Sequence, residues 1–400
     1  MKLPSNDDDK IVQRLQAPVK RLQIPLVNRG GRRLQTLDVF RGLTVFLMIV
    51  VNTQGSGAVP YRQLMHADWN GFTLTDLVFP SFLFAMGNAL VFAINKGRSQ
   101  PKSELLRRIA KRSVLIFLVG LALSWYATMH FTAGGIAFVG LAHLRIMAVL
   151  QRIALCYGLA GLLALYIRPS GLGVSAMVLL LAYWILLYLG GTGGQPYGET
   201  TNLVRLIDLR VLGAEHMYRE HGLLFDPEGL LSTLPATVNV IAGYLTGRFL
   251  LEKGRDPETT LWLLVAGLFV LGAGGLWSIG FPVNKKLWTS SFVLVTTGLD
   301  LLCMAVLFYF VEIRRWKGGV SFFTVLGKNP LFVYIFSNLL LIFLIWPVGT
   351  DTIGIDWINA VVFQRVAPGP LGSLLFALAF ALLCWVVAWW MDRKKIYLRL

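Results

Sequence analysis

Ten stretches of roughly twenty mostly apolar residues follow one another along this chain, and each is long enough to cross a lipid bilayer as a helix. Their predicted bounds are 38–58, 74–95, 113–131, 144–166, 172–190, 230–250, 259–280, 289–311, 329–347 and 370–391. Hydrophobic residues make up 56% of the 400 positions and charged residues only 14%, which is more apolar surface than one soluble core can bury. The sequence therefore predicts an all-α integral membrane bundle of about ten transmembrane helices and excludes intrinsic disorder.

The Lys and Arg residues report which side of the membrane each loop faces. Of the 37 basic residues, 27 lie in segments that face the cytosol if the N-terminus is cytosolic, and 8 lie in the outer segments. Because cytosolic loops carry an excess of Lys and Arg, this split predicts ten spans with both termini in the cytosol. The formal net charge of +16 is then a topology signal, and no nucleic-acid partner is expected.

A single transmembrane domain is expected over residues 37–400, preceded by a basic, mobile cytosolic arm at residues 1–36. The longer outer loops are 191–229 and 348–369. They are expected to contain an amphipathic piece near 202–213 and a short interfacial helix around Trp357. The three cysteines lie in apolar runs, so neither a disulfide framework nor a metal motif is predicted.

The common motifs of soluble enzymes are missing, so any chemistry has to come from polar residues near the spans. Asp38 and Arg41 lie three positions apart at the inner end of the first span. They form either a local ion pair or a site where Arg41 faces a cytosolic anion. At the inner end of the ninth span, Lys328 and Asn329 precede Pro330, a pattern typical of a helix cap or of a phosphate site.

Three polar residues gather at the outer rim of the first helical hairpin. Asn52 closes the first span, His66 lies in the loop and Asp76 opens the second span. A carboxylate beside an imidazole fixes its tautomer and raises its basicity, as acid–base or nucleophilic catalysis requires. His66 is therefore a catalytic candidate, although a single loop histidine is more often a surface residue. His216 and His221 in the long outer loop are an alternative outer metal or substrate site.

The fourth span carries polar residues at its outer end. Arg145 is expected at the interface, and Arg152 lies two turns deeper, next to Gln151. A buried arginine needs an anionic partner or water. Either Arg152 pairs with Asp76 or with Asp300 of the eighth span, or it lines a polar cavity that crosses the membrane. The two adjacent polar residues favour the cavity.

Several blocks of sequence carry a family resemblance in collinear order. They are residues 37–42, 66–71, 75–80, 84–87, 144–146, 149–152, 226–229, 282–288, 327–329 and 333–334. Together they cover most of residues 35–345 and resemble the heparan-alpha-glucosaminide N-acetyltransferase family. The block around His66 is long and specific, and the chain looks like a bacterial member of that family.

The resemblance implies a transmembrane acetylation. Acetyl-CoA is used from the cytosol, and the acetyl group reaches the amine of a glucosamine unit on the far side. By position, His66 matches the catalytic histidine of the family and Asp76 the acid that follows it. Asn52 matches the preceding asparagine, with a longer loop between Asn52 and His66 here. The resemblance also implies a homodimer in the bacterial inner membrane.

The predicted membrane side and the charge of each residue give the remaining candidates for contact with acetyl-CoA and with the sugar. The nucleotide of acetyl-CoA is expected at the basic inner mouth, near Arg41, Lys328 and Asn329. Its pantetheine arm is expected to pass Gln151 and Arg152, and no metal is expected. The candidates for binding the amino sugar are Trp69, Asn70, Arg145 and Asn284.

The residues leave two mechanisms and a second function open. His66 either deprotonates the sugar amine for direct attack on the thioester or accepts the acetyl group first. Asp76 would orient the imidazole, and Asn52 would donate to the oxyanion of the tetrahedral intermediate. The alternative function is a transporter of amino sugars or N-acetylglucosamine, for which the polar slot is the pathway and no acetyl-CoA site is needed.

Overall fold

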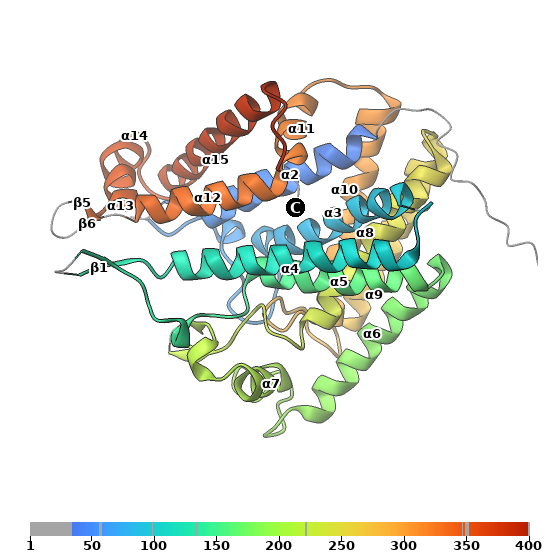
Figure 1. Ribbon diagram of the computed structural model, residues 1–400, viewed down its shortest axis with the longest axis horizontal. Helices are drawn as coiled ribbons and strands as arrows, with labels where there is room; N and C mark the ends of the chain where they lie inside the picture. Colours follow the sequence, from blue (N-terminus) through green and yellow to red (C-terminus); the bar gives the residue numbers. More distant parts are fainter. Residues whose placement is uncertain are drawn as a thin grey trace, which may run out of the picture.

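A computed structural model describes residues 34–398 apart from 56–57, 98, 133–134, 221, 346 and 349–351. Residues 1–33 of the predicted cytosolic arm and His221 therefore lie outside the described residues. The described chain is mostly helical, with three short antiparallel strand pairs in its connections (Figure 1).

The α-helices are α2 (Gln35–Asn52), α3 (Leu74–Lys96), α4 (Lys102–Tyr126), α5 (Val149–Tyr166), α6 (Pro169–Gly190), α7 (Leu203–Val211), α8 (Thr233–Lys253), α9 (Pro257–Trp277), α10 (Ser290–Phe308), α11 (Val320–Lys328), α12 (Pro330–Leu344), α13 (Gly354–Ile358), α14 (Gln364–Val366) and α15 (Pro370–Arg393). The strands are β1 (His130–Thr132), β2 (Gly135–Ala137), β3 (Arg219–Glu220), β4 (Leu223–Leu224), β5 (Pro347–Val348) and β6 (Thr352–Ile353). Short 3₁₀ or π turns are η1 (Arg62–Leu64), η2 (Leu141–His143), η3 (Ala214–His216), η4 (Tyr309–Ile313) and η5 (Asn359–Phe363).

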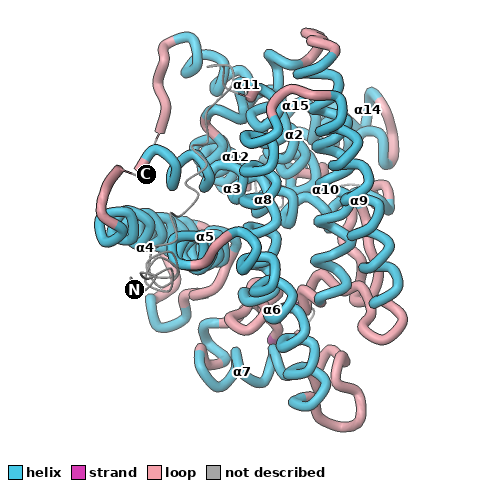
Figure 2. Tube along the Cα trace, turned by 90° about the vertical axis from the view of Figure 1, so that its right-hand side faces the viewer, coloured by secondary structure: helices cyan, strands magenta, loops and turns pink. Residues whose placement is uncertain are grey.

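Eight described helices are long and apolar enough to cross a membrane, or nine if α11 and α12 form one bent span. This confirms an all-α polytopic membrane protein. The remaining predicted span, 230–250, corresponds to the 21-residue helix α8. Its polar residues make its most apolar part less apolar than that of each of the eight helices counted above. Helix α8 packs against α3, α5, α6 and α10 in the middle of the bundle (Figure 2). A helix covered by other helices can carry the polar side chains that lipid contact disfavours.

Glycines let α3 and α8 pack backbone against backbone. A methyl group on Gly87 of α3 would lie 2.0 Å from the carbonyl oxygen of Val240. One on Gly243 of α8 would lie 1.9 Å from the carbonyl oxygen of Phe84. Neither position has room for a side chain, and small residues at such contacts are typical of closely packed membrane helices. The contact fixes α3, whose first turn carries Asp76, relative to the centre of the bundle.

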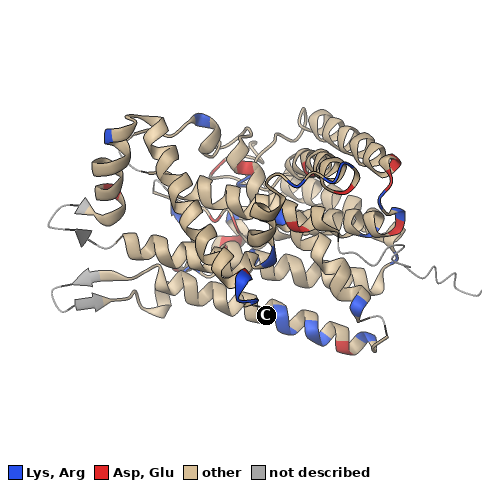
Figure 3. Ribbon diagram, turned by 90° about the horizontal axis from the view of Figure 1, so that it is seen from above, with Lys and Arg blue, Asp and Glu red and all other residues tan. Residues whose placement is uncertain are grey.

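Two helices begin or end at a different residue from the one that the apolar runs predict. Helix α2 ends at Asn52 rather than at 58, and the hydroxyl of Thr53 donates back to the carbonyl of Ile49 at 2.7 Å. Helix α4 begins at Lys102 rather than at 113, because its basic first turns continue the helix beyond its apolar part. Figure 3 shows basic residues along one end of the helix at its lower edge, whereas the middle parts of the helices are mostly uncharged.

The fourth predicted span is also shorter than expected. Helix α5 begins at Val149 rather than at 144, since the backbone of Ala148 is extended. Arg145 therefore lies in an extended segment before the helix, and Arg152 lies in its first turn. The predicted distance of two turns between these arginines inside one helix is wrong.

The ninth predicted span, 329–347, is part of a broken helix. Helices α11 and α12 meet at an angle of 83°. Asn329 has a non-helical conformation (φ −128°, ψ 47°), since a following proline disfavours the α region, and Pro330 has no backbone N–H to continue the first helix. The segment before Asn329, expected as a loop, is helical from Val320.

Two cavities lie near opposite ends of α2. We call them the inner and the outer cavity, after the predicted side of the membrane on which each lies. Gln35 at the start of α2 and Asp392 at the end of α15 line the inner cavity. Asn52 at the end of α2 and Asp76 at the start of α3 line the outer one. Since α2 has 18 residues, its ends are about 27 Å apart. This alternation of helix ends agrees with the predicted order of the spans.

Candidate active site

The outer cavity has a volume of about 630 Å³ and a wall rich in charged and aromatic side chains. The residues that line it are Asn52, His66, Ala67, Asp68, Trp69, Asp76, Arg145, Glu199, Tyr218, Leu223, Phe225, Pro227, Glu228, Lys285 and Lys286. Five of the predicted site residues are among them, contributed by the end of α2, the following loop, the start of α3 and the segment before α5. The structure thus brings together candidates that lie far apart in the sequence.

His66 and Asp76 form a hydrogen-bonded pair in this cavity. Nδ1 of His66 lies 2.8 Å from Oδ1 of Asp76. Because a carboxylate only accepts, Nδ1 carries the proton and Nε2 keeps a lone pair. The side chain of His66 is 48% exposed and that of Asp76 only 1%, so the ring faces the cavity and the acid lies behind it. Nε2 is then suited to act as a general base or as a nucleophile.

The carboxylate of Asp76 is held in place because it also caps α3. Its Oδ2 accepts hydrogen bonds from the backbone N–H of Thr73 at 3.1 Å, the hydroxyl of Thr73 at 2.9 Å and the backbone N–H of Ala67 at 3.2 Å. Thr73 and Asp76 form a capping box. The local signal that starts the helix thus also orients His66.

Lys285 joins this pair from the loop between α9 and α10. Its Nζ lies 3.0 Å from Nδ1 and 3.1 Å from Nε2 of His66, and 3.9 Å from Oδ1 of Asp76. Burial lowers the pKa of the Lys285 ammonium, while the negative charges of Glu228 and Asp76 oppose this shift. The sequence analysis did not select Lys285, because a lysine in an outer loop looks like a solvated charge. The only signal was its place in the family-like block 282–288.

Asn70 and Asn284 hold two loops together. Nδ2 of Asn284 donates to Oδ1 of Asn70 at 3.1 Å, and Oδ1 of Asn284 accepts from the backbone N–H of Leu287 at 2.8 Å. Asn284 is fully buried, and neither asparagine lines the outer cavity. These contacts show that the two residues hold the loops together, and their expected contact with the sugar stays a prediction.

Trp69 and Asn52 lie in the cavity wall. The indole N–H of Trp69 donates to the carbonyl of Tyr197 at 2.9 Å, and its ring packs edge-on against Phe225 with centroids 5.3 Å apart. Asn52 is exposed at the end of α2. Both side chains are placed where a ligand in the cavity can contact them.

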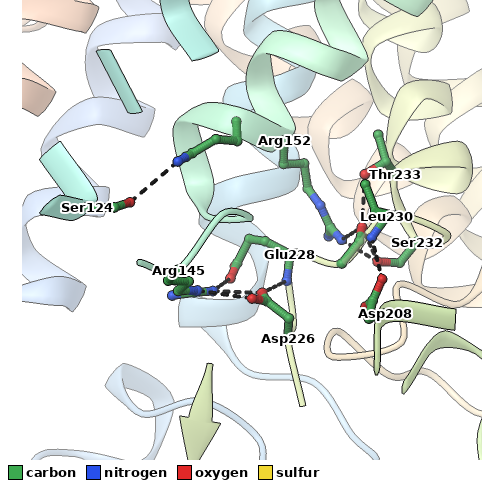
Figure 4. Close-up of polar contacts among 11 residues, drawn as sticks. Ser124, Arg145, Arg152, Asp208, Asp226, Glu228, Leu230, Ser232 and Thr233 are labelled. Carbon is green, nitrogen blue, oxygen red and sulfur yellow. Dashed lines mark hydrogen bonds and ion pairs between the residues drawn. The ribbon is translucent and has the colours of Figure 1, made fainter. Parts of the chain in front are cut away.

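Arg145 forms an ion-pair cluster at the cavity (Figure 4). Its Nη2 donates to Oδ1 of Asp226 at 2.8 Å and to Oε2 of Glu228 at 2.7 Å. The guanidinium also lies 4.6 Å above the ring of Tyr218. Burial acts to lower the pKa of Arg145, but the two acids raise it overall, so the guanidinium stays charged. Its expected contact with the sugar is a prediction that these ion pairs leave open.

Arg152 is buried behind the cavity wall rather than in it. Its Nη2 donates to the carbonyl of Gly229 at 3.0 Å and to the hydroxyl of Ser232 (Figure 4). The guanidinium lies 4.9 Å above the ring of Trp288. These contacts engage Nη2 and the face of the guanidinium, whereas Nε and Nη1 have no hydrogen-bond partner in the described structure.

The predicted pairing of Arg152 with Asp76 or Asp300 is wrong. Among the described residues Arg152 forms no ion pair, and Oδ1 of Asp300 instead accepts from the hydroxyl of Ser81 at 2.5 Å. Gln151 is also fully buried, and neither Gln151 nor Arg152 lines the outer or the inner cavity. In the described structure the first turn of α5 is packed against its neighbours, and the contact of these two residues with the pantetheine arm stays a prediction.

Asp208 of α7 is a buried acid that the sequence analysis did not select. Its Oδ1 accepts from the backbone N–H of Leu230 at 2.9 Å, whereas Oδ2 has no hydrogen-bond partner in the described structure (Figure 4). Burial raises the pKa of Asp208 to about 7; the hydrogen bond from Leu230 opposes this shift, and the charge of Asp226 adds to it. Asp208 thus supports the turn around Gly229 that also binds Arg152.

The raised pKa of Asp208 predicts a pH-dependent effect of Asp208→Asn. Because the folded state binds this proton more tightly than the unfolded state, the wild type loses stability as the pH rises from about 4 to about 7. The asparagine keeps the acceptor for Leu230 and has no charge to bury. We expect the wild type to lose on the order of 2 kcal/mol more than the variant between pH 5 and pH 8.

Thermal unfolding of the detergent-purified protein at the two pH values measures this difference. Glu104→Gln, at a half-exposed carboxylate of α4 that pairs with Arg108, is the control and should change with pH as the wild type does. An equal loss of stability in Asp208→Asn and wild type would contradict the raised pKa.

The inner cavity has a volume of about 970 Å³ and a mixed charged lining. Its basic residues are Arg255, Arg315, Lys317 and Lys328, and its acids are Asp38, Glu312 and Asp392. Nζ of Lys328 lies 2.9 Å from both carboxylate oxygens of Asp392. Of the three residues predicted to contact the nucleotide, only Lys328 lines this cavity.

The other two inner candidates have structural contacts. Nη1 of Arg41 donates to the carbonyl of Gly327 at 3.1 Å and lies 3.8 Å from Oδ1 of Asp38, which favours the local ion pair. Nδ2 of Asn329 donates to the carbonyl of Ile396 at 2.7 Å, so this side chain anchors the C-terminal segment. Neither position lines the inner cavity.

The remaining histidines make local contacts. Nδ1 of His216 lies 2.7 Å from the carbonyl oxygen of Leu144, and Nδ1 of His143 lies 2.7 Å from Oε2 of Glu215. Within the described ranges no three His, Cys, Asp or Glu side chains are arranged to hold a metal ion. The expected partner of His216, His221, lies outside these ranges.

Fold and site together define a class of protein: a polytopic membrane protein with a charged, histidine-containing cavity at one end of its helices. Residues 33–277 match the family model described as heparan-alpha-glucosaminide N-acetyltransferase, catalytic. The chain belongs to this family. The match includes the loop and helix ends that carry His66, Asp76, Arg145 and Glu228, whereas the loop of Lys285 follows it.

Two mammalian proteins are similar to the chain over most of its length. The human heparan-alpha-glucosaminide N-acetyltransferase is 28% identical over 356 residues, which cover 76% of this chain and 52% of the human protein. The mouse protein of the same name is 27% identical over 362 residues, covering 76% of this chain and 53% of its own length. The chain thus spans about half the length of these relatives.

Proposed function

We propose that this chain transfers the acetyl group of acetyl-CoA to the amine of a glucosamine-type sugar at the outer, periplasmic face of a bacterial inner membrane. The single observation that carries the proposal is the Asp76–His66 pair, which leaves Nε2 facing the outer cavity. Membership of an N-acetyltransferase family supports the reaction class. The homodimer implied by the resemblance is part of the proposal.

In the direct route, His66 acts as a general base. Its Nε2 takes a proton from the neutral sugar amine while the lone pair of the amine nitrogen forms a bond to the thioester carbon. The carbonyl electron pair moves to the oxygen; its return breaks the carbon–sulfur bond and releases the CoA thiolate, which takes the proton back from the imidazolium. Asp76 stabilises the imidazolium through Nδ1.

In the second route, Nε2 itself attacks the thioester. The carbon–sulfur bond breaks, CoA leaves as a thiolate, and the acetyl group stays on the imidazole until the amine displaces it. Both routes need the same tautomer of His66 and the same support from Asp76. They differ kinetically, since only the second one releases CoA before the amine reacts.

The inner cavity is our candidate for the nucleotide of acetyl-CoA. Its four basic residues suit phosphate groups, and Arg315 and Lys317 lie on an exposed turn before α11. The donor has to reach from this cavity toward His66 beside α2, whose ends are about 27 Å apart. This assignment retains Lys328 from the sequence analysis and replaces Arg41 and Asn329 by residues of the cavity wall.

The test is acetyl transfer by the purified protein in liposomes. Acetyl-CoA labelled in the acetyl group is supplied on one side and glucosamine on the other, and the expected result is labelled N-acetylglucosamine on the glucosamine side. Omission of protein and of acetyl-CoA are the controls. Movement of N-acetylglucosamine without any acetylation of the amino sugars offered would overturn the proposal in favour of a transporter.

A further inference from the structure

We propose that Lys285 is a catalytic group of this site, placed to stabilise the oxyanion that forms when the acetyl carbonyl is attacked. The inference rests on the proposed acetyl transfer and adds a residue to it. Its basis is the contact of one ammonium with both ring nitrogens of His66, at 3.0 and 3.1 Å.

The two nearly equal distances define where the ammonium lies. In the plane of the ring, a point about 3 Å from both nitrogens would overlap ring carbon atoms, so Nζ of Lys285 lies over a face of the imidazole. Nδ1 already donates its proton to Asp76, and the lone pair of Nε2 lies in the ring plane. The ammonium therefore leaves Nε2 open toward the cavity while standing directly beside it.

This position suits the charge that develops during acyl transfer. When the carbonyl carbon becomes tetrahedral next to Nε2, its oxygen carries the negative charge and can turn toward the face where Lys285 lies. An ammonium there can donate a charge-assisted hydrogen bond to that oxygen. In the ground state the thioester carbonyl carries little charge, so the contact strengthens toward the transition state and accelerates the reaction.

The loop around Lys285 is fixed before any substrate binds. Its own carbonyl accepts from the backbone N–H of Trp288 at 3.0 Å. The indole N–H of Trp288, which is fully buried, donates to Oδ1 of Asn239 on the central helix α8 at 3.1 Å. On the other side, Asn284 holds the loop to Asn70. Such preorganisation is what makes a donor effective in stabilising an oxyanion.

Asn52, the residue first expected to donate to the oxyanion, is placed less directly. It lines the same cavity, but none of the hydrogen bonds described for this part of the chain joins its side chain to His66, whereas Lys285 lies about one hydrogen-bond length from the ring. Lys285 also carries a full positive charge, whereas the amide of Asn52 is neutral. The geometry thus assigns the main stabilising role to the lysine.

The test compares kcat and KM for wild type, Lys285→Met, Lys285→Arg and Lys285→Cys by release of CoA and formation of acetylated sugar. We expect Lys285→Met to lose about 10²-fold in kcat with little change in either KM, as for loss of an oxyanion donor. Lys285→Arg keeps a cation and should retain more activity. Arg210→Met, at an exposed cation of α7 outside the cavity wall, is the control expected to match wild type.

Chemical rescue tests whether the reaction needs the positive charge of residue 285 or only a side chain that fills its place. Lys285→Cys treated with 2-bromoethylamine regains an ammonium on a side chain of nearly the same length, and its activity should recover; treatment with iodoacetamide, which adds a neutral group, should not restore it. Wild type receives the same treatments, since two of its three cysteines are buried and Cys303 is half-buried.

Two failures can be told apart. If Lys285→Met keeps the kcat of an active wild type, or if aminoethylation restores nothing, the role of Lys285 is overturned while the acetyl transfer stands. A wild type that acetylates no amino sugar overturns the proposed function, and the inference that rests on it falls as well.

Discussion

Replacing His66 by alanine is expected to reduce acetyl transfer by at least about 10³-fold, the upper range for loss of a general base. Nε2 of His66 is the uncharged basic nitrogen that faces the outer cavity, and no other imidazole lines that cavity in the described chain. Binding of acetyl-CoA should change little, because the proposed nucleotide site lies at the other end of α2. The measurement is the rate of labelled N-acetylglucosamine formation, together with acetyl-CoA binding by calorimetry.

His143→Ala is the matched control, since His143 lies on the same side of the protein and pairs with Glu215 outside the cavity. It should retain the activity of the wild type. An active His66→Ala protein would show that another group activates the amine, and the outer cavity would then lose its assigned role.

Asp76→Asn is expected to lower kcat by about 10³-fold without unfolding the protein, because the exchange inverts the tautomer of His66. Three donors from Thr73 and Ala67 surround Oδ2 of Asp76, so the amide oxygen of asparagine should take that place. The amide NH₂ then faces Nδ1 of His66, which must accept rather than donate. Nε2 becomes protonated and can act neither as base nor as nucleophile.

The helix cap survives in this variant, so the melting temperature should stay close to that of the wild type. Asp256→Asn makes the same exchange at the N-cap of α9, where the carboxylate accepts from the backbone N–H of Glu258, and should leave activity unchanged. A kcat of Asp76→Asn within a factor of about 3 of the wild type would contradict the role of the carboxylate in setting the tautomer.

Much of the fold could be predicted because membrane insertion depends on local properties. A run of twenty apolar residues becomes a helix wherever it occurs, and the charges between runs orient it. The amphipathic helix α7 and the short helix α13 around Trp357 were found by the same local reasoning. The bend before Pro330 was missed because Lys328 and Asn329 look like an ordinary helix start, while the preceding helix has only nine residues and is too short to be recognised as part of a span.

The site was predicted as far as its residues are neighbours in sequence. His66 and Asp76 are ten positions apart and share one hairpin, so their pairing follows from the loop and the capping box. Arg152 was misjudged because its surroundings come from residues 77 and 80 positions away, Gly229 and Ser232. Nothing near Arg152 in the sequence indicates that its guanidinium contacts a carbonyl, a hydroxyl and an indole ring.

The amino-acid sequence by itself determined the membrane class, the order and orientation expected of the spans, the family resemblance and the His66–Asp76 pair, because each depends on composition or on short spacing. Only the tertiary structure decided that Lys285, 219 positions from His66, stands over its ring, and that Asn284 holds its loop to Asn70. It also showed that Arg145 is shared by Asp226 and Glu228. These contacts arise when the ends of separate helices meet at one face, and the packing that brings those ends together leaves no pattern along the chain.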